Sequence, residues 1–158
     1  MDDKLDAAFE RILPQLPEPI LLSDVLSDLR QNFVKFPNAM LGEVGLDRAF
    51  RIPWSSEGPK HLSNFTVPLN HQLHILEAQL DLAVELQRNV SLHSVKCQQA
   101  TLEFINRMAN KHGERWDMIS IDMHSCGLSA QMWKSLEVRI SNFILNYHFL
   151  SAIIEKSS

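Results

Sequence analysis

The stretch "AMLGEVGLDRAF", residues 39–50, is a short apolar segment that contains one carboxylate, Glu43, between two glycines. A short apolar run flanked by turn residues is typical of a buried strand in a parallel sheet. Burying a carboxylate costs several kcal/mol unless a cation, a proton or good hydrogen bonds compensate it. The sequence therefore predicts a compensating group beside Glu43.

Helix and strand patterns alternate after this first strand. Apolar stripes at helical spacing predict one helix over residues 68–88 and another over residues 98–110. Short apolar runs predict strands over residues 89–95 and 116–125. Strand, helix, strand, helix, strand is a βαβ series, so we expect an α/β fold with a parallel sheet and right-handed crossovers.

The segments around this series complete a single predicted domain. We expect a helical lead-in over residues 1–35, interrupted by prolines at 14–19, and a βα core over residues 36–136 that includes a long loop at 50–66. Residues 137–158 form a tail with apolar residues every three or four positions, which predicts a helix. Within the tail, "VRISN" at 138–142 also reads as a strand.

Composition constrains the class of protein. The chain has 158 residues, of which 45% are hydrophobic, enough for one domain with a real core. Fifteen Lys and Arg against nineteen Asp and Glu leave a net charge of −4, so no global basic field would hold a polyanion. Without a secretion signal or an 18-residue apolar run, we expect a cytoplasmic or nuclear location and no membrane contact. Cys97 and Cys126 are expected to be free thiols.

Each of the three predicted strands ends in a potential metal ligand: Glu43, His93 and His124. Ligands bind at the carboxyl ends of parallel strands, where residues from several strands can converge. A carboxylate and two neutral imidazoles suit Zn²⁺, Mn²⁺ or Mg²⁺, and such a cation would compensate Glu43. A single histidine at a strand end is more often a hydrogen-bonded structural residue, but three ligands at successive strand ends favour a shared site.

Further polar residues lie near this predicted site. Asp47, Arg48 and Arg51 follow Glu43, and a pair of arginines there is a plausible phosphate contact, with a solvated surface pair as the alternative. Gln72 and Gln79 are two helical turns apart, so they share a helix face that could support the strand bearing Glu43. Exposed or capping polar residues are an equally open interpretation of both glutamines.

Three segments resemble the TatD family of metal-dependent deoxyribonucleases: "GEVGLD" at 42–47, "HQLHILEAQLDLAVELQRNVSLHS" at 71–94 and "IDMHSCG" at 121–127. The variants "GLDRAFRIP" and "LHSV" look most like the family's fungal branch, which is related to the cut-nine-interacting protein. The resemblance implies a TIM barrel with a two-metal phosphodiesterase site at the carboxyl ends of its strands. By this resemblance Glu43 would be catalytic and bind metal, His93 and His124 would each bind a metal, and DNA would be the substrate.

The chain departs from the family's pattern at both ends. The family begins with a strand carrying an H-x-H pair and closes with a strand carrying a metal-binding aspartate. Here the first histidine is His61, no H-x-H occurs, and no aspartate follows Asp122. We therefore expect a partial TIM-barrel-like sheet that corresponds to the middle strands and lacks the family's first and last strands.

Three functions remain open on the sequence. The first is a metal-dependent hydrolase that cleaves DNA phosphodiesters, which the ligands Glu43, His93 and His124 favour. The second is a non-catalytic member of the family that binds a protein partner, which the missing ligands favour. The third is an amidohydrolase with a small substrate, which the net charge of −4 fits slightly better.

Overall fold

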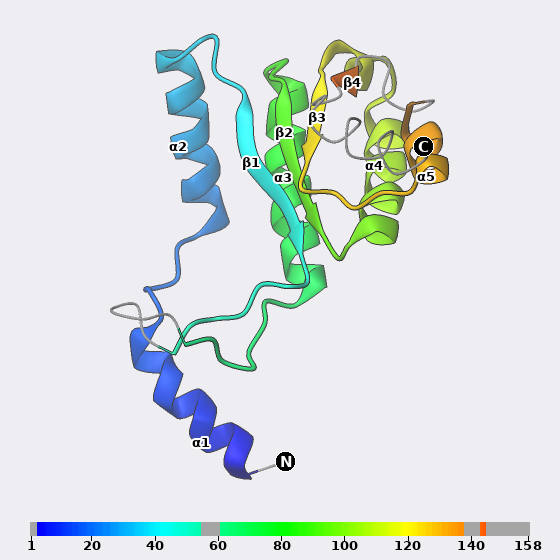
Figure 1. Ribbon diagram of the computed structural model, residues 1–158. Coiled ribbons are helices and arrows are strands. Elements are labelled where there is room, and N and C mark those ends of the chain that lie inside the picture. The colour runs from blue at the N-terminus through cyan, green and yellow to red at the C-terminus, as the bar shows by residue number, and fades with distance from the viewer. Residues whose placement is uncertain (1–2, 55–60, 138–142, 145–158) are drawn as a thin grey trace.

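The structure, a computed structural model, describes residues 3–54, 61–137 and 143–144 of the chain. Within these ranges, four parallel strands form one sheet in the order β1-β2-β3-β4 (Figure 1). The strands are β1 (Leu41–Asp47), β2 (Val90–Val95), β3 (Ile121–His124) and β4 (Phe143–Ile144). The helices are α1 (Asp3–Ile12), α2 (Leu22–Lys35), α3 (Leu69–Glu85), α4 (Gln98–His112) and α5 (Ala130–Glu137), with short 3₁₀ segments η1 (Leu13–Gln15) and η2 (Gly113–Met118).

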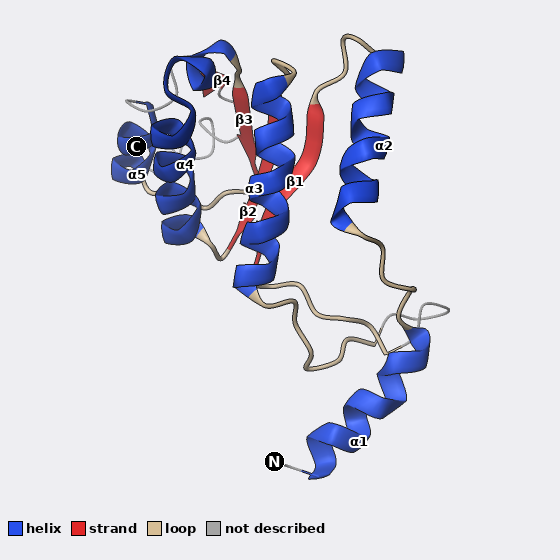
Figure 2. Cartoon of the chain, turned by 180° about the vertical axis from the view of Figure 1, so that it is seen from behind, coloured by secondary structure: helices blue, strands red, loops and turns tan. Residues whose placement is uncertain are grey.

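The sheet carries its helices on one side. Figure 2, which views the chain from the helix side, shows α3 in front of the strands with α4 beside it, and no helix among the described residues covers the opposite face. Alternation along β2 matches this arrangement, because Val90, Leu92 and Ser94 are buried while the residues between them are half-exposed. A parallel sheet with helices on its outer side is the arrangement of a TIM barrel, so the predicted α/β, partial TIM-barrel-like fold is confirmed.

The core lies between the sheet and the helices. It is built from fully buried side chains of the strands and of α3 and α4, including Leu46, Leu92, Ile121, Leu80, Ile105 and Met108. Each such side chain stabilises the fold by roughly 1.5 to 3 kcal/mol through apolar burial. Ion pairs link the helices at the surface, where Arg30 of α2 binds Glu85 of α3, and where Glu77 of α3 binds Lys111 of α4.

Both glycines of "GEVG" lie against β2. A Cβ atom on Gly42 would be 2.8 Å from the Cβ of Ser91, and one on Gly45 would collide with the backbone carbonyl of His93. Between these glycines the register slips by one residue, since Leu41 pairs with Val90 but Val44 pairs with Leu92. The glycines therefore allow β1 to approach β2 closely on both sides of Glu43.

The extra residue in β1 decides which side chains are buried. Leu41 and Val44 are both buried, although an even alternation would put them on opposite faces. Gly42 and Glu43, which lie between them, are exposed. The bulge therefore lets two apolar side chains reach the core and leaves Glu43 outside it.

Two predicted elements need correction. Residues 116–125 do not form one strand, because η2 occupies Gly113–Met118 and β3 begins only at Ile121. The apolar character there comes from Trp116, which is buried in the 3₁₀ turn. The predicted helical tail is wrong at Phe143–Ile144, whose backbone pairs with the outer edge of β3 at Ile121 and Asp122. The remainder of residues 138–158 lies outside the described residues.

The amino-terminal helix contacts the loop after β1. The ring of Phe9 lies 5.6 Å from that of Phe65 in an edge-to-face arrangement, and Arg11 lies over the ring of Trp54 at 5.4 Å. Ile12, at the end of α1, is fully buried. None of the helices in the described ranges is both long and apolar enough to span a membrane.

Candidate metal centre

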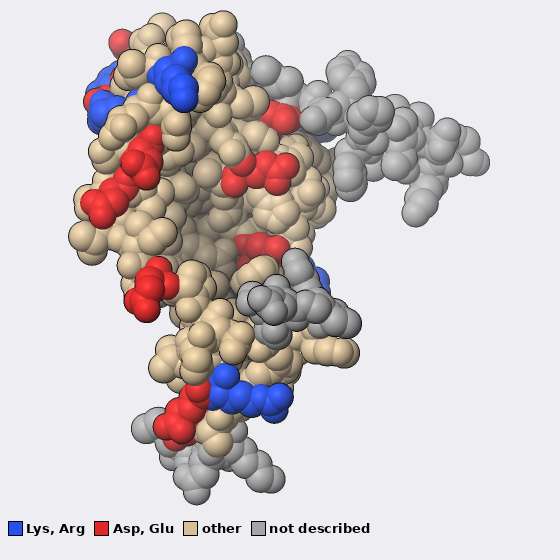
Figure 3. Space-filling model, turned by 90° about the vertical axis from the view of Figure 1, so that its left-hand side faces the viewer, with Lys and Arg blue, Asp and Glu red and all other residues tan. Residues whose placement is uncertain are grey.

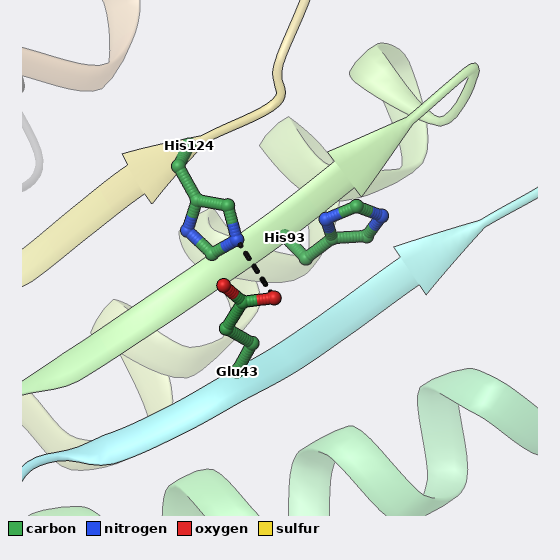
Figure 4. A group of neighbouring side chains, drawn as sticks. All are labelled: Glu43, His93 and His124. Carbon is green, nitrogen blue, oxygen red and sulfur yellow. Dashed lines mark ion pairs between the residues drawn. The ribbon is translucent and has the colours of Figure 1, made fainter.

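Glu43, His93 and His124 converge on the uncovered face of the sheet (Figure 4). They come from β1, β2 and β3, and one ligand atom of each lies within 4.8 Å of the others. The Nε2 atom of His124 is 3.5 Å from Oε2 of Glu43, and the rings of His93 and His124 are 5.5 Å apart between centroids. The predicted convergence of these three side chains is confirmed.

The position of these residues within their strands differs from the prediction. Only His124 ends its strand, because β1 continues to Asp47 and β2 continues to Val95. His93 pairs with Gly45 on one side and with His124 on the other. The three side chains therefore project from one face of the sheet near its carboxyl edge, and the strands themselves set their spacing.

Burial of Glu43 was predicted and is wrong. Its side chain is 72% exposed, because the bulge in β1 turns it toward the uncovered face. Water can solvate an exposed carboxylate, so Glu43 requires no compensating cation. Two other observations favour a cation: the convergence of three side chains, and the orientation and hydrogen bonding of the His124 ring.

His124 is held in an orientation that suits a metal ligand. Its Nδ1 atom is 3.0 Å from the hydroxyl oxygen of Ser91, and its buried Nε2 atom has no hydrogen-bond partner among the described residues. In a neutral imidazole one nitrogen donates and the other accepts. If Nδ1 donates to Ser91, the lone pair of Nε2 is free, which is the usual state of a ligating histidine. The donor set fits a divalent cation, because Nε2 faces the carboxylate of Glu43 at 3.5 Å without a hydrogen bond to any described residue.

Asp47 lies beside His93 and shapes the loop after β1. One carboxylate oxygen, Oδ2, is 3.6 Å from Nε2 of His93. The other, Oδ1, accepts hydrogen bonds from the backbone N–H groups of Ala49 and Phe50, at 2.6 and 3.0 Å. Figure 4 shows a ring nitrogen of His93 on the side of His124 and Glu43. Asp47 thus offers a negative partner to the imidazole while its other oxygen is held by the backbone.

The two glutamines of α3 behave differently. Gln72 accepts a hydrogen bond from the backbone N–H of Asp47 at 2.8 Å and donates to the carbonyls of Asp47 and Val67 at 3.1 and 2.9 Å. It therefore fixes the end of the strand that bears Glu43. Gln79 is half-buried within α3, and its side chain makes no hydrogen bond with any residue that the structure describes.

Within the described ranges, the two predicted arginines make no hydrogen bond or ion pair with Glu43, His93 or His124. Arg51 donates from Nη1 to the backbone carbonyls of Arg48 and Phe50, at 3.2 and 3.0 Å. Arg48 lines a cleft between the first turns of α3 and α4. In the described part of the chain, neither guanidinium forms an ion pair or hydrogen bond with Glu43, and their predicted contact with phosphate stays a prediction.

Two polar residues beside this cluster, Ser91 and Asp122, were not identified from the sequence. Ser91 precedes His93 by two positions, so both lie on the same face of β2, and that spacing was the available signal. Asp122 is the register partner of Ser91, and its buried Oδ1 atom has no hydrogen-bond partner among the described residues. Cys97 and Cys126 are free, as predicted. Both are buried, and burial raises the pKa of both thiols, which argues against a nucleophilic role.

The fold and the side chains together define a class: TIM-barrel-like α/β proteins with side chains that could hold a metal ion on adjacent parallel strands. A family model described as "TatD related DNase" matches residues 21–141. The chain belongs to this family.

Two curated relatives match parts of the chain. The protein named "Cut9-interacting protein scn1" of Schizosaccharomyces pombe is 41% identical over 95 residues, which cover 55% of this chain and 28% of that protein. The "Uncharacterized deoxyribonuclease YMR262W" of Saccharomyces cerevisiae is 26% identical over 129 residues, which cover 79% of this chain and 39% of that protein. The matched region thus spans less than half of either relative. No solved structure matches the chain.

Proposed function

We propose that the chain carries part of the site of a metal-dependent deoxyribonuclease, with Glu43, His93 and His124 holding a divalent ion, Mg²⁺, Mn²⁺ or Zn²⁺. The observation that carries this proposal is the approach of their three ligand atoms to within 4.8 Å of one another. Membership of the TatD-related family supports it. The Saccharomyces cerevisiae relative is named a deoxyribonuclease, and this name supports DNA as the substrate.

A divalent cation at these side chains would stabilise the negative charge that develops on phosphoryl oxygens during hydrolysis. By accepting a hydrogen bond from Nδ1–H of His124, Ser91 would keep the proton on that nitrogen and leave Nε2 available as a ligand. The exposed carboxylate of Glu43 can hydrogen-bond a water molecule and accept a proton from it. The carboxylate of Asp47, 3.6 Å from Nε2 of His93, would help to hold that ring in place.

The experiment is cleavage of a fluorescent DNA oligonucleotide by the purified chain with and without Mn²⁺. We expect cleavage with Mn²⁺ that stops with EDTA, and a loss of about 100-fold or more in rate for Glu43→Gln. Glu114→Gln is the matched control, since Glu114 is exposed and lies on η2, outside the cluster. Unchanged cleavage by Glu43→Gln, or cleavage that persists in EDTA, would contradict the proposal.

The second candidate is a member of the family that binds a protein and does not hydrolyse DNA. The relative of Schizosaccharomyces pombe, named for its interaction with Cut9, favours this candidate. The surface adds a second reason. On the face where α2 lies, acidic side chains surround a hollow while Lys and Arg lie at the margins (Figure 3), and α2 itself carries exposed Asp24 and Asp28. Such a face repels DNA and suits a partner with a basic surface.

Titration calorimetry of the chain with a Cut9-type protein tests this candidate. Saturable binding by wild type that weakens in the variant Asp24→Asn/Asp28→Asn would support it, together with an absence of DNA cleavage. The control is Glu43→Gln, whose side chain is on β1 and should leave the affinity for the partner unchanged.

A further inference from the structure

A cleft of about 620 Å³ opens at one end of the helix layer, apart from the three metal ligands. It is formed by the first turns of α3 and α4 and by the residues that directly follow β1 and β2. Figure 2 shows the first turns of both helices at the same end of the layer. The residues used below, all of which line this cleft, are Arg48, Lys96, Cys97, Gln99, Glu103 and Arg107.

Positive charge is concentrated in this cleft. Arg48, Lys96 and Arg107 line it, against one carboxylate, Glu103. Arg48 and Lys96 are exposed, and neither side chain forms an ion pair within the described ranges. Since the whole chain has a net charge of −4, three cations around one cleft are a local exception.

Arg107 and Glu103 already have partners, and these contacts leave the cleft with a net positive charge. Arg107 binds Glu77 through one nitrogen at 2.9 Å, which leaves other guanidinium donors available. Glu103 accepts a hydrogen bond from the side-chain amide of Gln99 at 2.7 Å. The net character of the lining is therefore that of an anion site.

The backbone adds donors of the same sign. Cys97, the residue before α4, makes no side-chain hydrogen bond to the helix, and the first backbone N–H groups of α4 have no partner within the helix. These groups and the helix dipole favour an anion at this end. They reinforce the site that Arg48 and Lys96 define.

The cleft adjoins the carboxyl edge of the sheet. Arg48 directly follows Asp47, and Asp47 lies 3.6 Å from His93, one of the three metal ligands. Lys96 follows Val95, the last residue of β2. A chain of phosphates that crossed this edge would meet the cations on one side and the cluster on the other.

We propose that this cleft binds backbone phosphates of single-stranded nucleic acid, separately from the reacting phosphate at Glu43, His93 and His124. The identity of the ligand rests on the proposed function. Guanidinium groups match phosphate oxygens in pairs, and an ammonium adds a point charge. Several cations along an open cleft suit a polyanion, because each phosphate along the strand offers a further contact.

Fluorescence anisotropy of a short labelled oligothymidylate tests the proposal in EDTA, so that no divalent cation contributes. The variant Arg48→Gln/Lys96→Gln removes the two unpaired charges. We expect its affinity to fall roughly tenfold, and the slope of log K against log salt to become shallower by about 1.4, or roughly 0.7 for each lost phosphate contact. Arg115→Gln/Lys134→Gln is the charge-matched control, since both residues are exposed outside the cleft.

Three results would overturn the proposal: no binding by wild type in EDTA, equal weakening by the control variant, or displacement of the oligonucleotide by inorganic phosphate at the same phosphate concentration. The melting temperatures of both variants must match that of wild type. The outcome is separable from that of the proposed function. Binding of the oligonucleotide without cleavage would support the proposed cleft and contradict the proposed hydrolase. Cleavage at subsaturating DNA that is unaffected by Arg48→Gln/Lys96→Gln would support the hydrolase and contradict the cleft.

Discussion

The hydroxyl oxygen of Ser91 on β2 lies 3.0 Å from Nδ1 of His124 on β3. This contact crosses between two neighbouring strands on the uncovered face of the sheet, where the register pairs Ser91 with Asp122. It determines which nitrogen of His124 carries the proton if the imidazole is neutral and Ser91 accepts. The capacity of His124 to bind a metal through Nε2 therefore depends on Ser91, which lies outside the group of three side chains.

Replacing Ser91 should weaken metal binding while leaving all three ligands in place. We expect Ser91→Ala to lower the affinity for Mn²⁺ by roughly tenfold, because His124 loses the partner that fixes its tautomer and ring orientation. Titration calorimetry measures this change. The control is Ser94→Ala on the same strand. The hydroxyl of Ser94 is hydrogen-bonded to that of Thr101 at 2.8 Å inside the protein and does not contact His124.

Ser94→Ala should lower the free energy of unfolding by about 1 kcal/mol or more and leave the affinity for Mn²⁺ unchanged. If both serine variants lost affinity equally, general loosening of β2 would explain the effect and the specific role of Ser91 would be wrong.

Gln72 and Gln79 provide a matched pair on α3. Gln72→Leu removes three hydrogen bonds to the backbone of Asp47 and Val67. We therefore expect the free energy of unfolding to fall by about 1 to 3 kcal/mol. Gln79→Leu removes no hydrogen bond to a described residue and should change stability by less than about 0.5 kcal/mol. Urea unfolding of the two variants checks this difference, and equal losses would show that Gln72 does not fix the end of β1.

Gly45 should tolerate no side chain. A Cβ atom there would collide with the backbone carbonyl of His93, so Gly45→Ala must push β1 away from β2. We expect this variant to lower the free energy of unfolding by more than about 3 kcal/mol. Gly127→Ala is the control, because its Cβ would meet only the side-chain amide of Gln98, at 3.4 Å. Thermal unfolding distinguishes the two, and a normal melting temperature for Gly45→Ala would contradict the close approach of the strands.

Hydrophobic periodicity predicted the βαβ series because each strand and helix buries one face against a single core. The helices around Leu80 and Ile105 and the strands ending near His93 and His124 all show the expected pattern. Convergence of Glu43 with the two histidines was also predictable, since residues near the carboxyl ends of parallel strands meet at one edge.

Other features depended on contacts that no local pattern reveals. The exposure of Glu43 follows from a slip in the register between β1 and β2, which arises only when the strands pair. The strand at Phe143–Ile144 depends on the open edge of β3. The domain limits at residues 35 and 136 and the location in cytoplasm or nucleus stay predictions.

Binding of Mn²⁺ to the metal-free chain, measured by titration calorimetry for wild type and Glu43→Ala, tests the central claim that Glu43, His93 and His124 form one metal site. We expect wild type to bind one ion weakly, because three ligands are fewer than a two-metal centre uses. Glu43→Ala should show no measurable binding, whereas Glu114→Ala should bind as wild type does. Unchanged affinity in Glu43→Ala, or an absence of binding by wild type, would contradict the account.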